Sequence, residues 1–108
     1  GHKIQIEIRN GCGVSNLARM YTDFLREQGL DVLDSKNADH FNYLETQILH
    51  HRGNLKRAKE LANILMIEDS KIIEDKNELL FYDLTLIIGK DYITLPSYRE
   101  AVLFQPPF

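Results

Sequence analysis

The chain has 108 residues, of which 44% are hydrophobic and 27% are charged, and its formal net charge is −3. These values are ordinary for one soluble globular domain. The negative balance argues against a general nucleic-acid or polyanion binder, so any basic site must be local. No apolar stretch approaches the roughly 18 residues that a membrane-spanning helix needs, and no signal peptide is visible.

The chain start and the single cysteine leave the cellular compartment open. Gly1 and His2 fit the remnant of a removed purification tag, so a signal or anchor upstream of them is compatible with the sequence. Cys12 is the only cysteine, which excludes an intrachain disulfide. An exported protein can fold without a disulfide when its core is large enough.

The N-terminal part predicts a β-α-β unit. Residues 3–9 alternate isoleucine with polar side chains, which is typical of a strand whose polar face is wet or lies at a sheet surface that is only partly covered. Apolar residues then recur at helical spacing across residues 15–28, with Ser15 as the expected N-cap and Gly29 just beyond the end. Residues 30–34 predict a second strand, which a right-handed crossover makes parallel to the first.

The second half predicts three more strands and one more helix. Residues 43–50 alternate loosely, as a third strand does. Asn54 is the expected N-cap of a helix over residues 55–66, and residues 72–73 are a short strand candidate in an acidic stretch. Residues 83–89 form a nearly continuous apolar run, which is typical of a strand buried on both faces.

The resulting order, β-α-β-β-α-β-β, predicts an α/β fold: a two-layer sandwich in which two helices cover one face of a mixed sheet. A complete doubly wound sheet would need more crossover helices than the chain supplies. We expect the domain to span residues 3–92. Residues 93–108 combine prolines and aromatic residues without a period, so we expect a tail packed across the domain without a regular element.

The junction of the first strand and first helix carries a candidate ligand loop, made of Asn10, Gly11, Cys12, Gly13 and Ser15. Two glycines one residue apart indicate a tight turn with φ > 0, and the following helix start can hold an anion. A dinucleotide fingerprint needs a third glycine where this chain has Asn16. A structural turn, with Asn10 bonding across it, is therefore the favoured interpretation, and a nucleotide or phosphate ligand is the alternative.

Neither the cysteine nor the histidines predict a reactive centre. Cys12 lies at a helix start, where a thiolate is stabilised, but no histidine is near it in the sequence, so a small loop filler is favoured. His50 and His51 would point to opposite faces of a strand and could not share a metal ion. We expect surface histidines, no metal and no cofactor.

One local cluster of basic residues is a candidate polyanion patch: His51, Arg52, Lys56, Arg57 and Lys59, preceded by His50. The simpler interpretation is the solvated face of a helix. The functional interpretation is a site for a phosphate-bearing or acidic polymer. Cations near a helix start oppose the helix dipole, and this mild penalty favours a use for the cluster.

The last strand is bracketed by Asp83 and Asp91 and contains Thr85. We expect Thr85 to be buried with its hydroxyl satisfied by neighbouring backbone. The two aspartates either cap turns, which is favoured, or join Asn10 and Thr46 at one rim of the sheet. No second carboxylate is placed to form an acid/base pair, so the sequence predicts no enzyme.

Over residues 4–92, the order and spacing of these segments resemble the LytR C-terminal domain family. The segments that carry the resemblance are, in chain order, Ile6-Glu7-Ile8-Arg9-Asn10-Gly11-Cys12-Gly13-Val14, Leu17-Ala18, Leu25, Gly29-Leu30-Asp31-Val32, Asn37-Ala38-Asp39, Tyr43, Thr46-Gln47-Ile48, Ala58, Leu61-Ala62, Leu65 and Asp83-Leu84-Thr85-Leu86-Ile87-Ile88-Gly89-Lys90-Asp91. The chain departs from the family at Asn16, where a further glycine is frequent, and this narrows the approach of any ligand to the loop.

The resemblance implies an extracytoplasmic place in a bacterial envelope, with any membrane anchor or phosphotransferase domain outside this chain. Together with the lack of a catalytic constellation and the basic cluster, the resemblance leads us to expect a non-catalytic accessory domain that binds or positions a cell-wall polymer or an envelope protein. The negative net charge predicts no nucleic-acid partner. One alternative is a nucleotide- or phosphate-binding module that uses the loop at Gly11–Ser15. Another is an assembly module that pairs through a sheet face or edge.

Overall fold

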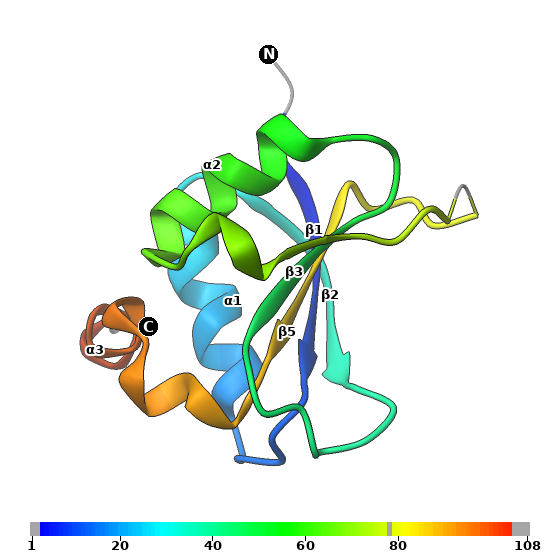
Figure 1. Cartoon of the computed structure of the whole chain (residues 1–108). Coiled ribbons are helices and arrows are strands. Elements are labelled where there is room, and N and C mark those ends of the chain that lie inside the picture. The colour runs from blue at the N-terminus through cyan, green and yellow to red at the C-terminus, as the bar shows by residue number, and fades with distance from the viewer. Residues whose placement is uncertain (1–2, 78, 105–108) are drawn as a thin grey trace.

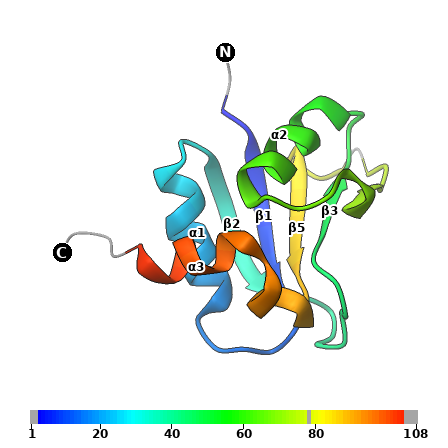
Figure 2. The ribbon, with the colours of Figure 1, turned by 60° about the vertical axis from the view of Figure 1, so that its left-hand side comes forward.

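The computed structural model describes residues 3–77 and 79–104. Five strands form one mixed sheet in the order β2-β1-β5-β3-β4, and three helices lie on one side of it (Figures 1 and 2). The α/β class and the two layers are confirmed, with one helix more than predicted. The elements are β1 (Gln5–Asn10), α1 (Leu17–Glu27), β2 (Asp31–Asn37), β3 (Gln47–His50), α2 (Leu55–Leu65), β4 (Ile72–Glu74), β5 (Leu84–Ile88) and α3 (Pro96–Leu103), with 3-10 turns η1 (Asp69–Lys71) and η2 (Lys90–Thr94).

The predicted β-α-β unit is confirmed, because β1 and β2 pair in parallel. Gly29 follows the end of α1 with φ +89, the left-handed conformation that favours glycine at this position. The start of α1 differs from the prediction. Asn16, not Ser15, is the N-cap, with φ 67 and no side-chain cap bond, so the helix begins two residues later than expected.

Strand β5 lies at the centre of the sheet, parallel to β1 and antiparallel to β3. All five of its residues are buried, as the continuous apolar run predicted. Strand β3 is shorter than predicted and begins only at Gln47. The preceding residues 43–46 leave the ladder because they bond to the loops that follow β1 and β5.

The core lies between the sheet and the helices. Ile6 and Ile8 of β1 are fully buried there, together with Leu25 of α1 and Leu61 of α2. Full burial of such a side chain stabilises the fold by about 1.5–3 kcal/mol. Ala58 and Ala62 have no exposed surface; these small residues let α2 pack close to its neighbours.

The C-terminal tail was predicted to have no regular element, and this was wrong for residues 96–103, which form α3. Pro96 stands in the first turn, where its missing N–H costs nothing. Ser97 and Ala101, one helical turn apart, are buried, and the hydroxyls of Ser97 and Tyr21 are 3.1 Å apart. Because the buried residues of α3 are small, the sequence has no stripe of large apolar residues that would have predicted this helix. The part of the tail prediction that concerns residues 105–108 lies outside the described residues.

We predict that Gly89→Ala destabilises the protein by about 2–3 kcal/mol through overpacking. Its φ of −97 suits alanine, but a Cβ would lie 2.4 Å from the carbonyl carbon of Glu45, which is backbone. Gly29→Ala is the matched control: a Cβ there meets nothing within 4 Å, and only the positive φ opposes it, at a cost of about 1 kcal/mol. Urea unfolding measures both; equal stability of the two variants would contradict the steric account.

Candidate functional site

The glycine loop lies at the rim of the sheet where β1 and β5 end. Gly11 donates its N–H to the carbonyl of Ile88 at 2.8 Å and accepts a bond from the N–H of Tyr43 at 3.1 Å. A Cβ on Gly11 would lie 2.7 Å from Cδ2 of Tyr43 and 2.9 Å from the oxygen of Ile88. The predicted positive φ occurs at Gly13, at +80, and not at Gly11. Gly11 is therefore needed for close packing, and Gly13 for the turn.

The side chain of Asn10 bonds across this loop, as predicted. Its Oδ1 accepts the backbone N–H groups of Cys12 at 3.1 Å and Gly13 at 3.0 Å, and its Nδ2 donates to the oxygen of Val14 at 2.7 Å. Two of the amides that an anion would use are thus already engaged. The half-buried Cys12 packs against the core, with Sγ 3.5 Å from Asn10 Oδ1, which suits a loop filler. Ser15 is exposed.

Asp91 fixes the segment that precedes β3 to the same rim. Its Oδ1 accepts both the N–H and the hydroxyl of Thr46, at 2.9 and 2.7 Å, and the N–H of Gly89 donates to the Thr46 hydroxyl at 3.0 Å. Asp83 lies at the other end of β5 and accepts bonds from Asn54 Nδ2 at 2.9 Å and Gln5 N at 3.1 Å. Both aspartates therefore act structurally, and they do not form a pair.

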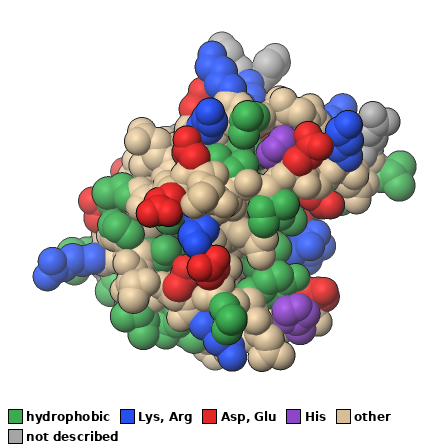
Figure 3. Space-filling model, viewed as in Figure 1, with side chains coloured by type: hydrophobic (Ala, Val, Ile, Leu, Met, Phe, Trp, Pro, Cys, Tyr) green, Lys and Arg blue, Asp and Glu red, His purple; other side chains and the backbone are tan. Residues whose placement is uncertain are grey.

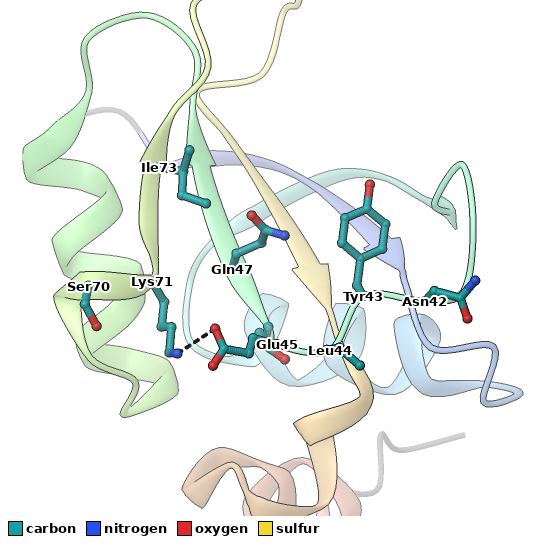
Figure 4. Close-up of a pocket in the computed structure, with 9 residues that line it drawn as sticks. Asn42, Tyr43, Leu44, Glu45, Gln47, Ser70, Lys71 and Ile73 are labelled. Carbon is teal, nitrogen blue, oxygen red and sulfur yellow. Dashed lines mark ion pairs between the residues drawn. The ribbon is translucent and has the colours of Figure 1, made fainter.

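A hollow of about 450 Å³ lies beside this rim (Figure 4). Lys71 Nζ and Glu45 Oε2 form an ion pair of 2.8 Å at its lower end, and this contact raises the pKa of Lys71. The charges of the pair cancel. The sequence did not predict this hollow, because its residues come from two separate segments: Asn42, Tyr43, Leu44, Glu45, Thr46 and Gln47, with Ser70, Lys71 and Ile73.

The sheet face without helices carries a buried carboxylate, that of Glu7. The sequence predicted that this face of β1 is wet or only partly covered, and a wet face is wrong at Glu7, which has no exposed surface. Its Oε1 lies 2.8 Å from Lys36 Nζ, and its Oε2 lies 3.0 Å from both Arg9 NH2 and Thr85 Oγ1. The alternating pattern identified the face correctly, but long neighbouring side chains exclude water from it.

The pKa of Glu7 is lowered even though the group is buried. Burial raises the pKa and is the largest single effect, but hydrogen bonds from Lys36, Arg9 and Thr85 and the charge of Arg9 together outweigh it. The same contact raises the pKa of Lys36. Glu7 is therefore a carboxylate that two cations hold in place.

Two further predictions on this face need correction. Thr85 is buried as expected, but its hydroxyl bonds to the side chains of Glu7 and His51 and not to backbone. Of the three histidines expected at the surface, His40 is exposed, whereas His50 and His51 are buried, with only 6% and 1% of their surface exposed. The Thr85 contacts and the burial of His50 and His51 follow from the position of β3 beside β5, which local sequence does not reveal.

Among residues 3–77 and 79–104, no group of three His, Cys, Asp or Glu side chains could hold a metal ion.

Members of the candidate polyanion patch line two different hollows. Arg52 lines an open hollow of about 710 Å³ together with His51, Gly53 and Lys76. Arg57 is half-buried and lines a different hollow, of about 380 Å³, with Lys3 and Glu60 among others. Lys76, from the segment after β4, was not predicted.

Lys56 and Lys59 are exposed on the first two turns of α2. In the described part of the chain, neither of them forms an ion pair with a carboxylate, and nor do Arg52 and Lys76. Figure 3 shows several basic side chains toward the upper end of the molecule, where α2 begins, with acidic side chains beside them. Arg52, Lys56, Lys59 and Lys76 are thus available to a ligand.

The family model described as LytR cell envelope-related transcriptional attenuator matches residues 3–92. The chain belongs to the LytR C-terminal domain family. Comparison with curated proteins and comparison with solved structures give no significant match. LytR C-terminal domains are associated with cell-envelope proteins and are generally non-catalytic accessory domains.

The matched part of this LytR C-terminal domain contains both the rim and the buried network on the open face, whereas α3 follows it. No helix among the described residues is long and apolar enough to cross a membrane. Four of the segments that carried the resemblance meet at the rim, since the loops at Asn10, Tyr43, Thr46 and Asp91 bond to one another or to shared neighbours. Their first role is to build the domain.

We predict that Glu7→Gln lowers the free energy of unfolding at neutral pH by about 2–4 kcal/mol, because it leaves Lys36 and Arg9 without their anion. The pKa of Glu7 is lower in the folded than in the unfolded state. Its contribution is therefore complete above the unfolded-state pKa and is lost as the pH falls through the folded-state pKa.

Urea unfolding at neutral and acidic pH measures this effect. The wild type should lose stability in acid more steeply than Glu7→Gln, so the two curves converge. Glu27→Gln, at the exposed end of α1, is the control and should follow the wild type. Parallel curves for the wild type and Glu7→Gln would contradict the assignment.

Proposed function

We propose that this domain is a non-catalytic accessory module of an extracytoplasmic envelope protein, and that it binds an anionic cell-wall polymer through its exposed cations. One observation carries the proposal: Arg52 and Lys76 come from separate segments, line the same hollow, and in the described part of the chain neither forms an ion pair with a carboxylate. A local cationic surface on a chain of net charge −3 favours a specific anionic ligand over general polyanion binding.

The surface of α2 extends this cationic region. Lys56 and Lys59 are three residues apart and so project from neighbouring positions on one helix face. Asn54, at the N-cap, gives its side-chain amide to Asp83 and makes no cap bond to the helix. Cations placed at such a helix start cost stability, which supports a role in binding rather than in folding.

The family context supports an envelope polymer as the ligand, since LytR C-terminal domains are associated with cell-envelope proteins. A membrane anchor outside this chain would hold the domain near the wall. Tethering converts a weak surface interaction into a useful one by raising the effective concentration of the ligand. The proposed role is therefore to position a polymer near the anchored protein, and an acidic protein partner is the competing occupant.

We predict that Arg52→Gln/Lys76→Gln binds purified Gram-positive wall that carries its anionic polymer at least tenfold more weakly than the wild type. Arg19→Gln/Arg99→Gln, exposed on α1 and α3, removes the same charge elsewhere and should bind normally. Wild-type binding should fall with added salt and on wall stripped of the polymer. Cosedimentation measures all of these, and equal retention of both double variants would overturn the proposal.

The alternative of a nucleotide- or phosphate-binding module at Gly11–Ser15 has less support from the geometry. Asn10 already accepts the N–H groups of Cys12 and Gly13, so a phosphate there would have to displace a side chain of the same loop. Titration with ATP or NAD, followed through the amide resonances of Cys12 and Gly13, separates this alternative from binding at Arg52.

A further inference from the structure

The hollow beside Arg52 has a buried imidazole in its wall. His51 follows β3 directly and is 1% exposed, yet it lines the hollow with Arg52, Gly53 and Lys76. An imidazole in such a position is fixed by its hydrogen bonds, and these bonds report which ring nitrogens carry protons.

The first ring nitrogen of His51 is a donor. Nδ1 lies 2.9 Å from the backbone oxygen of Asp75 and 3.3 Å from Oδ2 of the same residue. A carbonyl oxygen and a carboxylate oxygen only accept hydrogen bonds. Nδ1 therefore carries a proton.

The second ring nitrogen meets a hydroxyl that is already engaged. Nε2 lies 2.6 Å from Thr85 Oγ1, which lies 3.0 Å from Glu7 Oε2. Thr85 has one proton, and Glu7, held as a carboxylate by Lys36 and Arg9, has none to give. When Thr85 donates to Glu7, Nε2 must donate to Thr85, and His51 then carries a proton on both nitrogens.

We infer that His51 is held as an imidazolium and that its hollow, shared with Arg52 and Lys76, is a binding site for a phosphate group. This rests on the proposed function and deepens it by naming the ligand group and a third cation. A phosphodiester of a wall polymer and free inorganic phosphate share this chemistry.

One of the charged groups around His51, the carboxylate of Asp75, offsets one positive charge of the hollow. Asp75 faces Nδ1, so the hollow has a formal charge of +2 with the imidazolium and +1 without it, counting Arg52 and Lys76. The oxygen of Asp83 accepts the backbone N–H of His51 at 3.3 Å, and the Asp83 carboxylate is bonded to Asn54 and Gln5. Glu7 is matched by two cations of its own, Arg9 and Lys36.

Loss of the proton has a defined consequence for the network. A neutral His51 keeps the proton on Nδ1, so the Thr85 hydroxyl must turn from Glu7 to donate to Nε2. The hollow then loses one positive charge, and we expect phosphate binding to weaken roughly five- to tenfold at this short range. Thr85 links the protonation of His51 to the buried carboxylate.

Nitrogen NMR of the wild type tests the protonation directly. We expect both ring nitrogens of His51 to show protonated-type shifts in the folded protein. If Nε2 is unprotonated at every pH at which the protein is folded, the imidazolium assignment is wrong, whereas the proposed polymer binding is unaffected.

A titration tests the ligand. The probe is a short poly(glycerol phosphate), whose diester charge stays constant between about pH 5.5 and 8.5, with inorganic phosphate as a second arm. We expect saturable shifts at the amides of Arg52, Gly53 and Lys76, and affinity for the polymer that falls five- to tenfold as pH rises. Preference for inorganic phosphate would assign the site to a free ion, and no shift at these amides would remove the site.

Variants complete the test. His51→Gln should bind the diester probe five- to tenfold more weakly at low pH and should lose the pH dependence. His40→Gln, an exposed histidine at the opposite rim, should match the wild type. If His51→Gln does not fold, the pH series on the wild type decides alone. Wall binding that depends on Arg52 and Lys76 but not on pH would refute this inference and leave the proposed function intact.

Discussion

The missing side chains of Gly11 and Gly89 are the constraint on which this domain depends. The segment 43–46 lies against the ends of β1 and β5 so closely that a Cβ on Gly89 would lie 2.6 Å from the oxygen of Glu45. This contact and the bonds from Asp91 fix where β3 starts, and β3 then pairs antiparallel with β5 from Gln47 to His50. The rim thereby sets the register that brings His51 to Thr85 at the other end of the strand.

The second constraint is electrostatic. A carboxylate without exposed surface on an outer sheet face is costly unless its oxygens are all engaged, and Glu7 meets this condition through Lys36, Arg9 and Thr85. The network also ties three neighbouring strands, β2, β1 and β5, to one point on the open face. Two backbone groups of the edge strand β2 are also occupied by side chains. Arg26 donates to the oxygen of Val32, and Asp34 accepts the N–H of Ser35. Addition of another strand there is hindered, which disfavours assembly through that edge.

Local pattern predicted the fold class, the β-α-β unit, the buried β5 and the bond made by Asn10, because each follows from periodicity or from a side chain acting within a few residues. It could not predict which distant side chains meet. The burial of Glu7 depends on Lys36, the burial of His51 on Thr85, and the hollow at Arg52 on Lys76, all from other elements. The polyanion patch was predicted as a run of neighbours in sequence, whereas in the fold Arg52 and Arg57 line different hollows.

These contacts place the proposed site where a weak ligand suffices. A single phosphate held by two or three partly solvated cations binds weakly and responds to salt, but a polymer repeats its charge and a tethered domain meets it again after each dissociation. In the proposed site, the binding of phosphate also depends on the protonation of His51. Its proton is shared with a network that also stabilises the sheet, so the charge of the hollow and the integrity of the open face are coupled through one threonine hydroxyl. Substitution of Thr85 should therefore alter both properties, whereas substitution of Arg52 should alter only the affinity for the ligand.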